Sequence, residues 1–305
     1  MNSEKDSKLK PVIVTGANGF TGRFVCEELL KRKVPFLALV RPKTDINWFV
    51  ERSIKVIFAD INNFKDMSYA LSKGSSLINI ASIGFGAAPI LIKACKKENI
   101  KRVIFISTTA IFTKLNSKSK SIRINAEDFI LKSNLEFTIL RPTMIYGNYR
   151  DRNLIKLIKW IKRYPFIPVF NKGLALQQPI YVEDVAWAVV TSLLDPNAIN
   201  QIFNISGAYS INFSEMIDVI SKSLNKRIIK IPVNPKFAII LIKVLKYLNF
   251  KVPISEEQIN RVIEDKIFSN AKAKKIINFH PLSFQDGIKK EINQYLISLK
   301  TKSFK

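Results

Sequence analysis

Short apolar runs alternate with helix-length segments through the first half of the chain. Each run holds four or five residues, and the segments between them carry apolar side chains on one helical face. Strands that form continuous apolar runs between helices are typical of βαβ units, in which both faces of a parallel sheet are covered. The pattern predicts strands at 12–15, 36–40, 55–59, 77–80, 103–106 and 137–140, and helices at 22–33, 47–52, 64–71, 89–97 and 122–132.

The second half of the chain is less regular. It predicts amphipathic helices at 154–163, 182–194, 215–224 and 283–299, a strand at 201–205, and an apolar helix at 237–248. Ser214 is the expected N-cap of the helix at 215–224. We therefore predict an α/β fold: a Rossmann-type doubly wound parallel sheet with a smaller mixed α/β C-terminal substrate lobe. The sheet domain is expected to cover 1–150 with the returning segment 174–206, and the interwoven lobe 151–173 and 207–305.

Composition narrows the class of protein. With 305 residues, 47% of them hydrophobic, the chain can bury a sizeable core. Its two cysteines, Cys26 and Cys95, cannot build a disulfide framework, and the polar first ten residues do not resemble a secretory signal. We therefore expect a cytoplasmic location. The single histidine, His280, excludes a multi-histidine metal site, and we predict no metal.

The formal net charge of +25 comes from 49 Lys and Arg against 24 Asp and Glu. Such a charge suits nucleic acid, anionic lipid or an anionic small molecule. The basic residues are spread along a chain rich in Lys, Ile and Asn and form no arginine–aromatic recognition motif, so we interpret the charge as compositional drift with a surface that suits phosphate. We expect an anionic small-molecule substrate and no specific nucleic acid. Contact of the helix at 237–248, which carries Lys243 and Lys246, with a membrane surface is the less favoured alternative to that helix covering the lobe. A homodimer is left open.

Three glycines at a spacing of three residues follow the first strand directly. Gly16 allows a tight turn from strand to helix, Gly19 lets the backbone approach a pyrophosphate, and Gly22 lets the helix pack closely. The free N–H groups and the dipole at the start of the helix favour an anion. This arrangement predicts a dinucleotide-binding site.

The spacing and the preceding Thr15 resemble the short-chain dehydrogenase/reductase superfamily, in the extended and atypical branches that include the NAD-dependent epimerases and dehydratases of nucleotide sugars. The same resemblance extends over nearly the whole chain, through segments 58–61, 79–82, 106–112, 140–147, 178–186 and 279–288. It implies that the cofactor contacts Gly16, Asn18, Gly19, Phe20, Gly22, Asp60, Ile61, Asn79, Ala81, Ser82, Pro142 and Met144.

The end of the second strand indicates which cofactor is bound. NAD-specific sites of this kind place an acid there to hold the ribose 2′-hydroxyl. This chain has Arg41 and Lys43, which suit a 2′-phosphate. We therefore favour NADP over NAD. The alternative is that Arg41 stacks on adenine in a site that takes either cofactor.

The resemblance implies a proton relay made of a Ser or Thr, a Tyr, and a Lys four residues after the Tyr. Thr108 matches the first position. The Ala-Glu pair at 126–127 fixes the register of the relay helix, which puts Ser119 at the Tyr position and Arg123 at the Lys position. Arg123 keeps the positive charge and can hold ribose hydroxyls, but it cannot carry a proton.

This departure leaves two hypotheses open. In the first, the enzyme is active with a substituted acid–base group, for which the candidates beside Thr108 are Tyr146, Tyr149, Lys114 and Lys118. In the second, the chain is a non-catalytic NADP-binding structural or sensor protein, similar to the accessory dinucleotide-binding subunit of mitochondrial complex I.

Residues beyond the relay point to an anionic substrate. Arg150 and Arg152 open a helix, which predicts an anion site, and Gln178 lies in a loop that offers amides to substrate hydroxyls. We therefore expect an NAD(P)-dependent oxidoreductase or an epimerase. An epimerase is an isomerase. The resemblance implies a nucleotide sugar as substrate and a place in surface polysaccharide biosynthesis.

Overall fold

Seven parallel strands form the centre of the protein, in the order β11-β6-β5-β4-β1-β2-β3. The computed structural model describes residues 10–84, 86–115, 118–247 and 256–303. The strands are β1 (Val12–Thr15), β2 (Phe36–Val40), β3 (Val56–Phe58), β4 (Ser76–Asn79), β5 (Arg102–Ile106), β6 (Glu136–Pro142) and β11 (Gln201–Ile205). The predicted Rossmann-type parallel sheet is confirmed.

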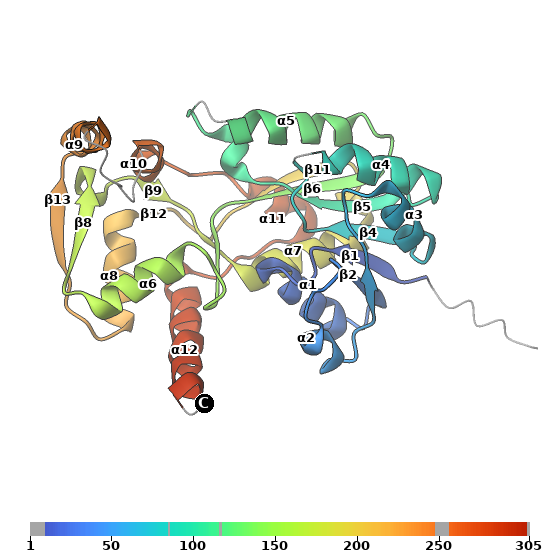
Figure 1. Ribbon diagram of the computed structural model, residues 1–305, viewed down its shortest axis with the longest axis horizontal. Coiled ribbons are helices and arrows are strands. Elements are labelled where there is room, and N and C mark those ends of the chain that lie inside the picture. The colour runs from blue at the N-terminus through green and yellow to red at the C-terminus, as the bar shows by residue number, and fades with distance from the viewer. Residues whose placement is uncertain (1–9, 85, 116–117, 248–255, 304–305) are drawn as a thin grey trace, which may run out of the picture.

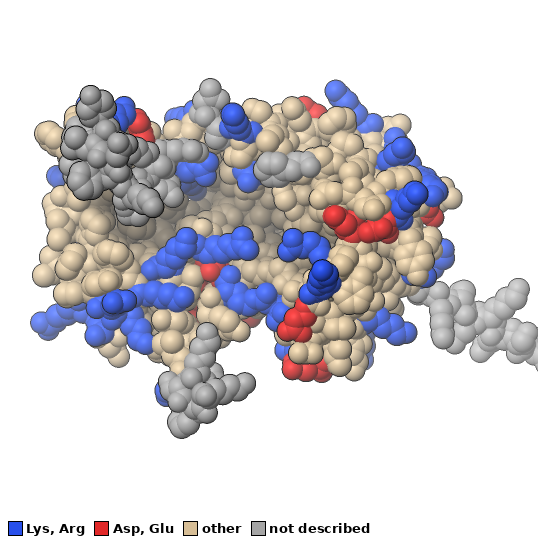
Figure 2. Space-filling view, in the orientation of Figure 1, with Lys and Arg blue, Asp and Glu red and all other residues tan. Residues whose placement is uncertain are grey.

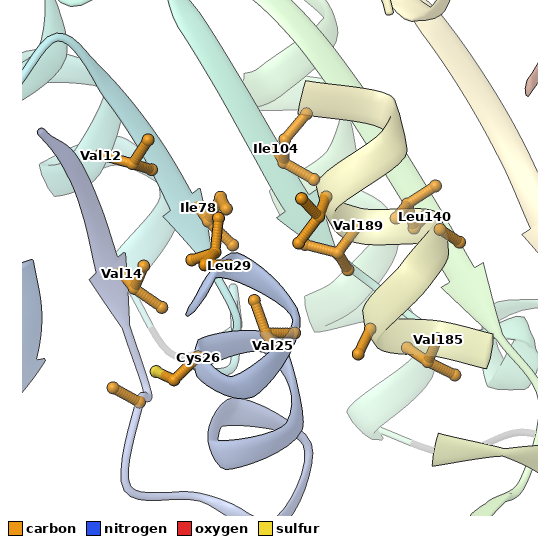
Figure 3. Packing of buried hydrophobic residues seen from close by; sticks show 14 of the residues in the cluster. Val12, Val14, Val25, Cys26, Leu29, Ile78, Ile104, Leu140, Val185 and Val189 are labelled. Carbon is orange, nitrogen blue, oxygen red and sulfur yellow. The ribbon is translucent and has the colours of Figure 1, made fainter. Parts of the chain in front are cut away.

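Helices cover both faces of this sheet (Figure 1). One face carries α1 (Phe20–Lys31), α2 (Asn47–Val50), α7 (Val182–Leu194) and α11 (Ala271–Ile277), and the other α3 (Phe64–Ser72), α4 (Ala87–Lys97) and α5 (Lys118–Leu131). Because side chains alternate along a strand, Val12 and Val14 point toward α1 and α7 while Ile13 points toward the opposite layer. Figure 3 shows the first layer, with Val25 and Val189 among its buried residues.

The remaining elements build a smaller lobe around a hydrophobic cluster of their own. Its helices are α6 (Leu154–Arg163), α8 (Phe213–Ser223), α9 (Pro235–Tyr247), α10 (Glu256–Ile263) and α12 (Phe284–Ser303), and its strands β7 (Ile145–Tyr146), β8 (Phe166–Phe170), β9 (Leu176–Gln177), β10 (Ile180–Tyr181), β12 (Ile211–Asn212) and β13 (Ile229–Val233). The end of the predicted helix at 237–248 lies outside the described residues. Among those described, no helix is long and apolar enough to cross a membrane.

The expected cap of α8 was wrong by two positions. Asn212, and not Ser214, caps the helix: its side chain accepts the N–H of Glu215 at 2.8 Å. The Glu215 carboxylate in turn accepts the N–H of Asn212 at 3.2 Å. This reciprocal pair satisfies two backbone donors at once, which the hydroxyl of Ser214 alone would not do.

Two acidic side chains face each other in the core of the smaller lobe. Glu291 of α12 is fully buried, and Asp151 accepts the backbone N–H groups of Asn153 and Ile155 just before α6. Burial first, and then the nearby charge of Asp151, raise the pKa of Glu291 to about 10. Burial also raises the pKa of Asp151. Glu291 is therefore protonated in the folded protein at neutral pH.

This proton makes stability depend on pH in a defined direction. The unfolded chain releases it near the ordinary pKa of 4.5, whereas the folded chain holds it to about 10. The free energy of unfolding should therefore fall as pH rises from about 5 to about 8, by up to about 1.4 kcal/mol per pH unit. The Glu291→Gln variant, which has no such proton, should show a flatter profile in urea unfolding. Parallel profiles for the two proteins would contradict this assignment.

Candidate functional site

A cleft of about 770 Å³ opens at the carboxyl edge of the sheet, between the sheet and the smaller lobe. The strand order reverses there, because β1 lies between β2 and β4, and ligands bind at such switch points in open α/β sheets. The cleft is lined by residues that follow β1, β4, β5 and β6, and by residues of the smaller lobe. Figure 2 shows this face hollowed, with Lys and Arg side chains along the border of the hollow.

The glycine loop at one end of the cleft has no room for a side chain at Gly16 or Gly22. Gly16 has a φ of +66°, and a Cβ there would lie 2.7 Å from the backbone N of Ala81. A Cβ on Gly22 would lie 2.1 Å from the carbonyl oxygen of Gly16. The N–H of Gly19 donates to that same oxygen at 2.9 Å, which closes the turn. The loop therefore holds the start of α1 close to the end of β1, as the glycine spacing predicts.

Two arginines converge on this loop through Asn18. Arg23 of α1 donates to the Asn18 Oδ1 at 2.7 Å, and Arg150 reaches across from the smaller lobe to donate to the Asn18 carbonyl oxygen at 3.0 Å. Burial, and next the charge of Arg150, lower the pKa of Arg23. The two guanidinium groups are thus close enough to repel each other.

An anion is what this arrangement requires. The second terminal nitrogen of Arg150, Nη1, is buried and has no hydrogen-bond partner among the described residues. The first turn of α1 carries no acidic residue, and the N-cap of α1, Gly19, provides no side-chain cap. An unpartnered guanidinium nitrogen, a second cation and free helix N–H groups at one point fit a diphosphate. The residues present therefore fit the pyrophosphate of a nicotinamide dinucleotide.

The loop after β4 is held in place beneath the glycines. The Thr15 hydroxyl donates to the Asn79 Oδ1 at 2.6 Å, and the Asn79 amide donates to the carbonyl oxygen of Ala81 at 2.9 Å. Asn79 is fully buried and uses these atoms within the protein, so it positions the loop instead of offering them to a ligand. Ser82 lies exposed in the same loop.

Other residues implied for the cofactor lie around the cleft and the end of the sheet. Phe20, Pro142 and Met144 line the cleft. Arg41 is exposed at the end of β2, where it is accessible to a 2′-phosphate. Asp60 is also exposed, but its carboxylate accepts the N–H of Asn62 at 2.9 Å.

Three residues expected for the reaction meet in the cleft. Ser119 and Arg123 lie one turn apart on α5 and line the cleft together with Thr108. The Thr108 Oγ1 accepts the N–H of Ala110 at 3.1 Å, which caps the short helix at Thr109–Phe112. Because this bond uses a lone pair, the hydroxyl of Thr108 keeps its proton for donation.

The structure corrects the proposed substitutes for the missing tyrosine. Tyr146 is 1% exposed and packs against Tyr181 and Phe284 in the core of the smaller lobe, so it does not reach the cleft. Burial raises its pKa further above the usual range. Tyr149 and Lys118 are exposed and do not line the cleft. Of those candidates, only Lys114 lines it.

The residues expected to bind the substrate also differ in where they lie. Arg152 lines the cleft, whereas Arg150 lies at the glycine loop. Gln178 was wrong as a substrate contact: its amide donates to the Gly207 carbonyl oxygen at 2.9 Å, and its Oε1 accepts the N–H of Phe268 at 2.9 Å. Both ends of this buried side chain are therefore used to hold the fold.

A segment near the C-terminus, residues 264–268, completes the cleft and was not predicted. The N–H of Lys266 donates to the Leu176 carbonyl oxygen at 2.7 Å, and Glu264 accepts the N–H of Lys114 at 2.7 Å. Lys266 lines the cleft, and burial lowers its pKa. No local motif marks this segment. More than 80 residues separate it from Leu176 of β9, and only the fold brings the two together.

Comparison with known proteins identifies the family. A sequence model of NAD(P)H-binding proteins matches residues 16–196, which is more than half of the chain. The chain belongs to the NAD(P)H-binding family.

The relatives of this NAD(P)H-binding protein include a subunit of a mitochondrial NADH dehydrogenase and an epimerase. It is 24% identical over 245 residues to the mitochondrial subunit 9 of the NADH dehydrogenase (ubiquinone) 1 alpha subcomplex of Arabidopsis thaliana, over 72% of this chain and 60% of that protein. It is 22% identical over 334 residues to an uncharacterized UDP-glucose epimerase of Bacillus subtilis (strain 168), over 94% of this chain and 98% of that protein. The chain thus spans less than two thirds of the length of the Arabidopsis thaliana relative.

A solved structure shows the same fold. The UDP-glucose 4-epimerase of Thermotoga maritima with UDP-glucose superposes with a TM-score of 0.74 at 16% identity, over 95% of this chain and 99% of that chain. This match shows the fold, and the similarity in sequence to the Bacillus subtilis epimerase agrees with the resemblance to the epimerase and dehydratase branch.

Proposed function

We propose that this protein is an NADP(H)-dependent oxidoreductase or epimerase that acts on a nucleotide sugar or a similar anionic substrate, as in the making of surface polysaccharides. The observation that carries the proposal is that one cleft joins the glycine loop to a hydroxyl donor, Thr108, and to a basic wall. Arg123 and Arg152 belong to that wall. The epimerase relatives, which differ from this chain at about four of every five positions, support the substrate class.

The cleft, the glycine loop and the end of β2 each have a task in this proposal. Arg23 and Arg150 hold the cofactor pyrophosphate at the start of α1, and Arg41 binds the 2′-phosphate that distinguishes NADP from NAD. Arg123 holds ribose hydroxyls, and Arg152 binds the anionic part of the substrate. A bound nicotinamide supplies or accepts the hydride.

The proton that accompanies the hydride requires a different group from the usual tyrosine. The Thr108 hydroxyl donates a hydrogen bond to the substrate oxygen and so orients the substrate. Lys266 lines the cleft and burial lowers its pKa below its ordinary value of 10.5, so we assign to it the exchange of this proton. Its ammonium group can protonate a developing alkoxide, and its amine can accept the proton in the reverse direction.

The test is turnover of NADPH, or epimerisation, with a panel of nucleotide sugars. Removing the hydroxyl in Thr108→Ala should slow the reaction by about one to three powers of ten, because a donor to the reacting oxygen is lost. Thr108→Ser, which keeps the hydroxyl, should restore most of the rate. A rate that Thr108→Ala leaves unchanged would remove Thr108 from the mechanism.

A non-catalytic NADP-binding protein is the second candidate, and one observation favours it. Among the described residues that line the cleft there is no tyrosine and no histidine. The relative in the NADH dehydrogenase complex fits this candidate. Tight NADPH binding without a reaction on any nucleotide sugar, and without an effect of Lys266→Met on such binding, would support it over the enzyme.

A further inference from the structure

The two-stranded sheet of the smaller lobe has an apolar outer face. The parallel strands β8 and β13 pair Phe166 with Ile229 and Pro168 with Ile231, so these four side chains lie on the same side. Ile229 is 68% exposed, Ile231 45% and Phe166 42%. The alternate positions face inward, since Ile167 and Val169 are buried in the core of the lobe and Lys230 binds Asp218 of α8 at 2.6 Å.

Apolar side chains continue from this sheet onto the neighbouring helices. Trp160 of α6 is 39% exposed, and its indole N–H donates to the Phe166 carbonyl oxygen at 2.8 Å. Phe237 and Ile240 of α9 are 72% and 57% exposed. Figure 1 places β8, β13 and α9 together at the outer end of the smaller lobe, away from the sheet. We call this surface the apolar end face; it consists of Trp160, Phe166, Pro168, Ile229, Ile231, Phe237 and Ile240.

The charge around the apolar end face is mostly positive. The two stretches of sequence that build it, 152–182 and 219–255, contain six and eight Lys and Arg respectively and no Asp or Glu. Arg163, Arg227 and Lys236 are exposed there. Acidic groups reach this region from outside those stretches: Asp218 pairs with Lys230, and Glu256 pairs with Lys243 at 3.4 Å. Asp218 and Glu256 form these ion pairs with Lys230 and Lys243, and not with the three exposed cations.

An apolar surface with a cationic border fits an anionic lipid bilayer. Apolar side chains enter the boundary between headgroups and acyl chains, and long basic side chains reach the phosphates beside them. An exposed tryptophan is typical of this boundary. A second copy of the chain fits less well, because pairing two such faces would bring their cationic borders together.

We propose that the apolar end face docks this protein on the surface of an anionic membrane. The proposal does not depend on the reaction in the cleft, and it uses none of the residues placed there. Docking holds the cleft beside the bilayer, so that the protein works at the membrane surface without spanning it.

Flotation with lipid vesicles tests the proposal on the full chain. The protein should float with vesicles of phosphatidylcholine containing about one third phosphatidylglycerol, and at least about tenfold less with phosphatidylcholine alone. A variant with Ile229→Ser, Ile231→Ser and Phe237→Ser should lose at least about tenfold in binding, and so should one with Arg163→Glu and Arg227→Glu.

The control variant changes exposed apolar residues far from this face. It combines Val50→Ser in α2 with Tyr69→Ser in α3, where the two side chains are 64% and 60% exposed on helices that cover the seven-stranded sheet. This variant should float like the wild type. Circular dichroism and NADPH binding show that each variant is folded. The proposal is overturned if the wild type stays unbound at physiological salt, or if the end-face variants bind vesicles like the wild type. It is also overturned if those variants instead convert a dimer into a monomer without changing lipid binding.

Discussion

Replacing Arg150 by Gln should weaken NADPH binding about 10- to 100-fold. Arg150 is the residue whose buried Nη1 lacks a partner at the glycine loop, beside the second guanidinium of Arg23. A hydrogen bond to a charged group contributes about 1.5–3 kcal/mol, which gives this range. Fluorescence titration of the nicotinamide measures the loss. The affinity for ADP should fall by a similar factor, because ADP carries the same diphosphate.

The neighbouring Arg152 provides the matched control. It lies two residues away in the sequence, but it lines the cleft, whereas Arg150 donates to the Asn18 carbonyl oxygen of the glycine loop. Arg152→Gln should therefore leave NADPH affinity within about twofold and raise the KM for an anionic substrate. Binding of 2′-AMP, which has no pyrophosphate, should be unchanged in Arg150→Gln. Equal losses of NADPH affinity in both variants would contradict a specific contact by Arg150.

Replacing Gly22 by Ala should cost about 3 kcal/mol of stability and abolish measurable cofactor binding. The added Cβ would lie 2.1 Å from the Gly16 carbonyl oxygen and 2.7 Å from that of Ala17. Both neighbours are backbone atoms of the turn, so α1 must move away from the loop to relieve the contact. That movement displaces the N–H groups that face the pyrophosphate. Urea unfolding and NADPH titration measure the two effects.

Gly84 is the control for this substitution. It is buried in the loop after β4, and an added Cβ would meet side-chain atoms and no backbone: the Ile122 Cγ2 at 3.0 Å and the Ser82 Oγ at 3.7 Å. Gly84→Ala should therefore cost less than about 1 kcal/mol and retain NADPH binding. If Gly22→Ala behaved like Gly84→Ala in both measurements, the close contact of α1 with the loop would not be essential.

The sequence predicts the sheet well because its signal is local. Each strand buried on both faces is a continuous apolar run, as in Val103–Ile106, and the helices between the strands have a clear apolar face. The strands β8 and β13 were not predicted. Prolines interrupt both, and β13 has no buried residue because one face of this ribbon meets solvent.

The site is predicted only in the parts that have a motif. The glycine loop, Thr108, Ser119 and Arg123 follow recognisable strand ends and a helix register, and the structure brings the last three together. Lys266 reaches the cleft through long-range contacts that no spacing encodes. Arg150 was expected in an anion site for the substrate, and its place at the glycine loop also depends on a long-range contact, with Asn18. Tyr146 shows the converse, because a residue suited to the chemistry is buried in the lobe by its neighbours.

The central claim is that the cleft binds a nicotinamide dinucleotide, with NADP favoured over NAD. Titration of the purified protein with NADPH and with NADH, followed by nicotinamide fluorescence, tests it most directly. We predict saturable binding of one NADPH per chain, at least about tenfold tighter than NADH, because Arg41 can pair with the 2′-phosphate. A folded protein that shows no saturable binding of either nucleotide would contradict the claim.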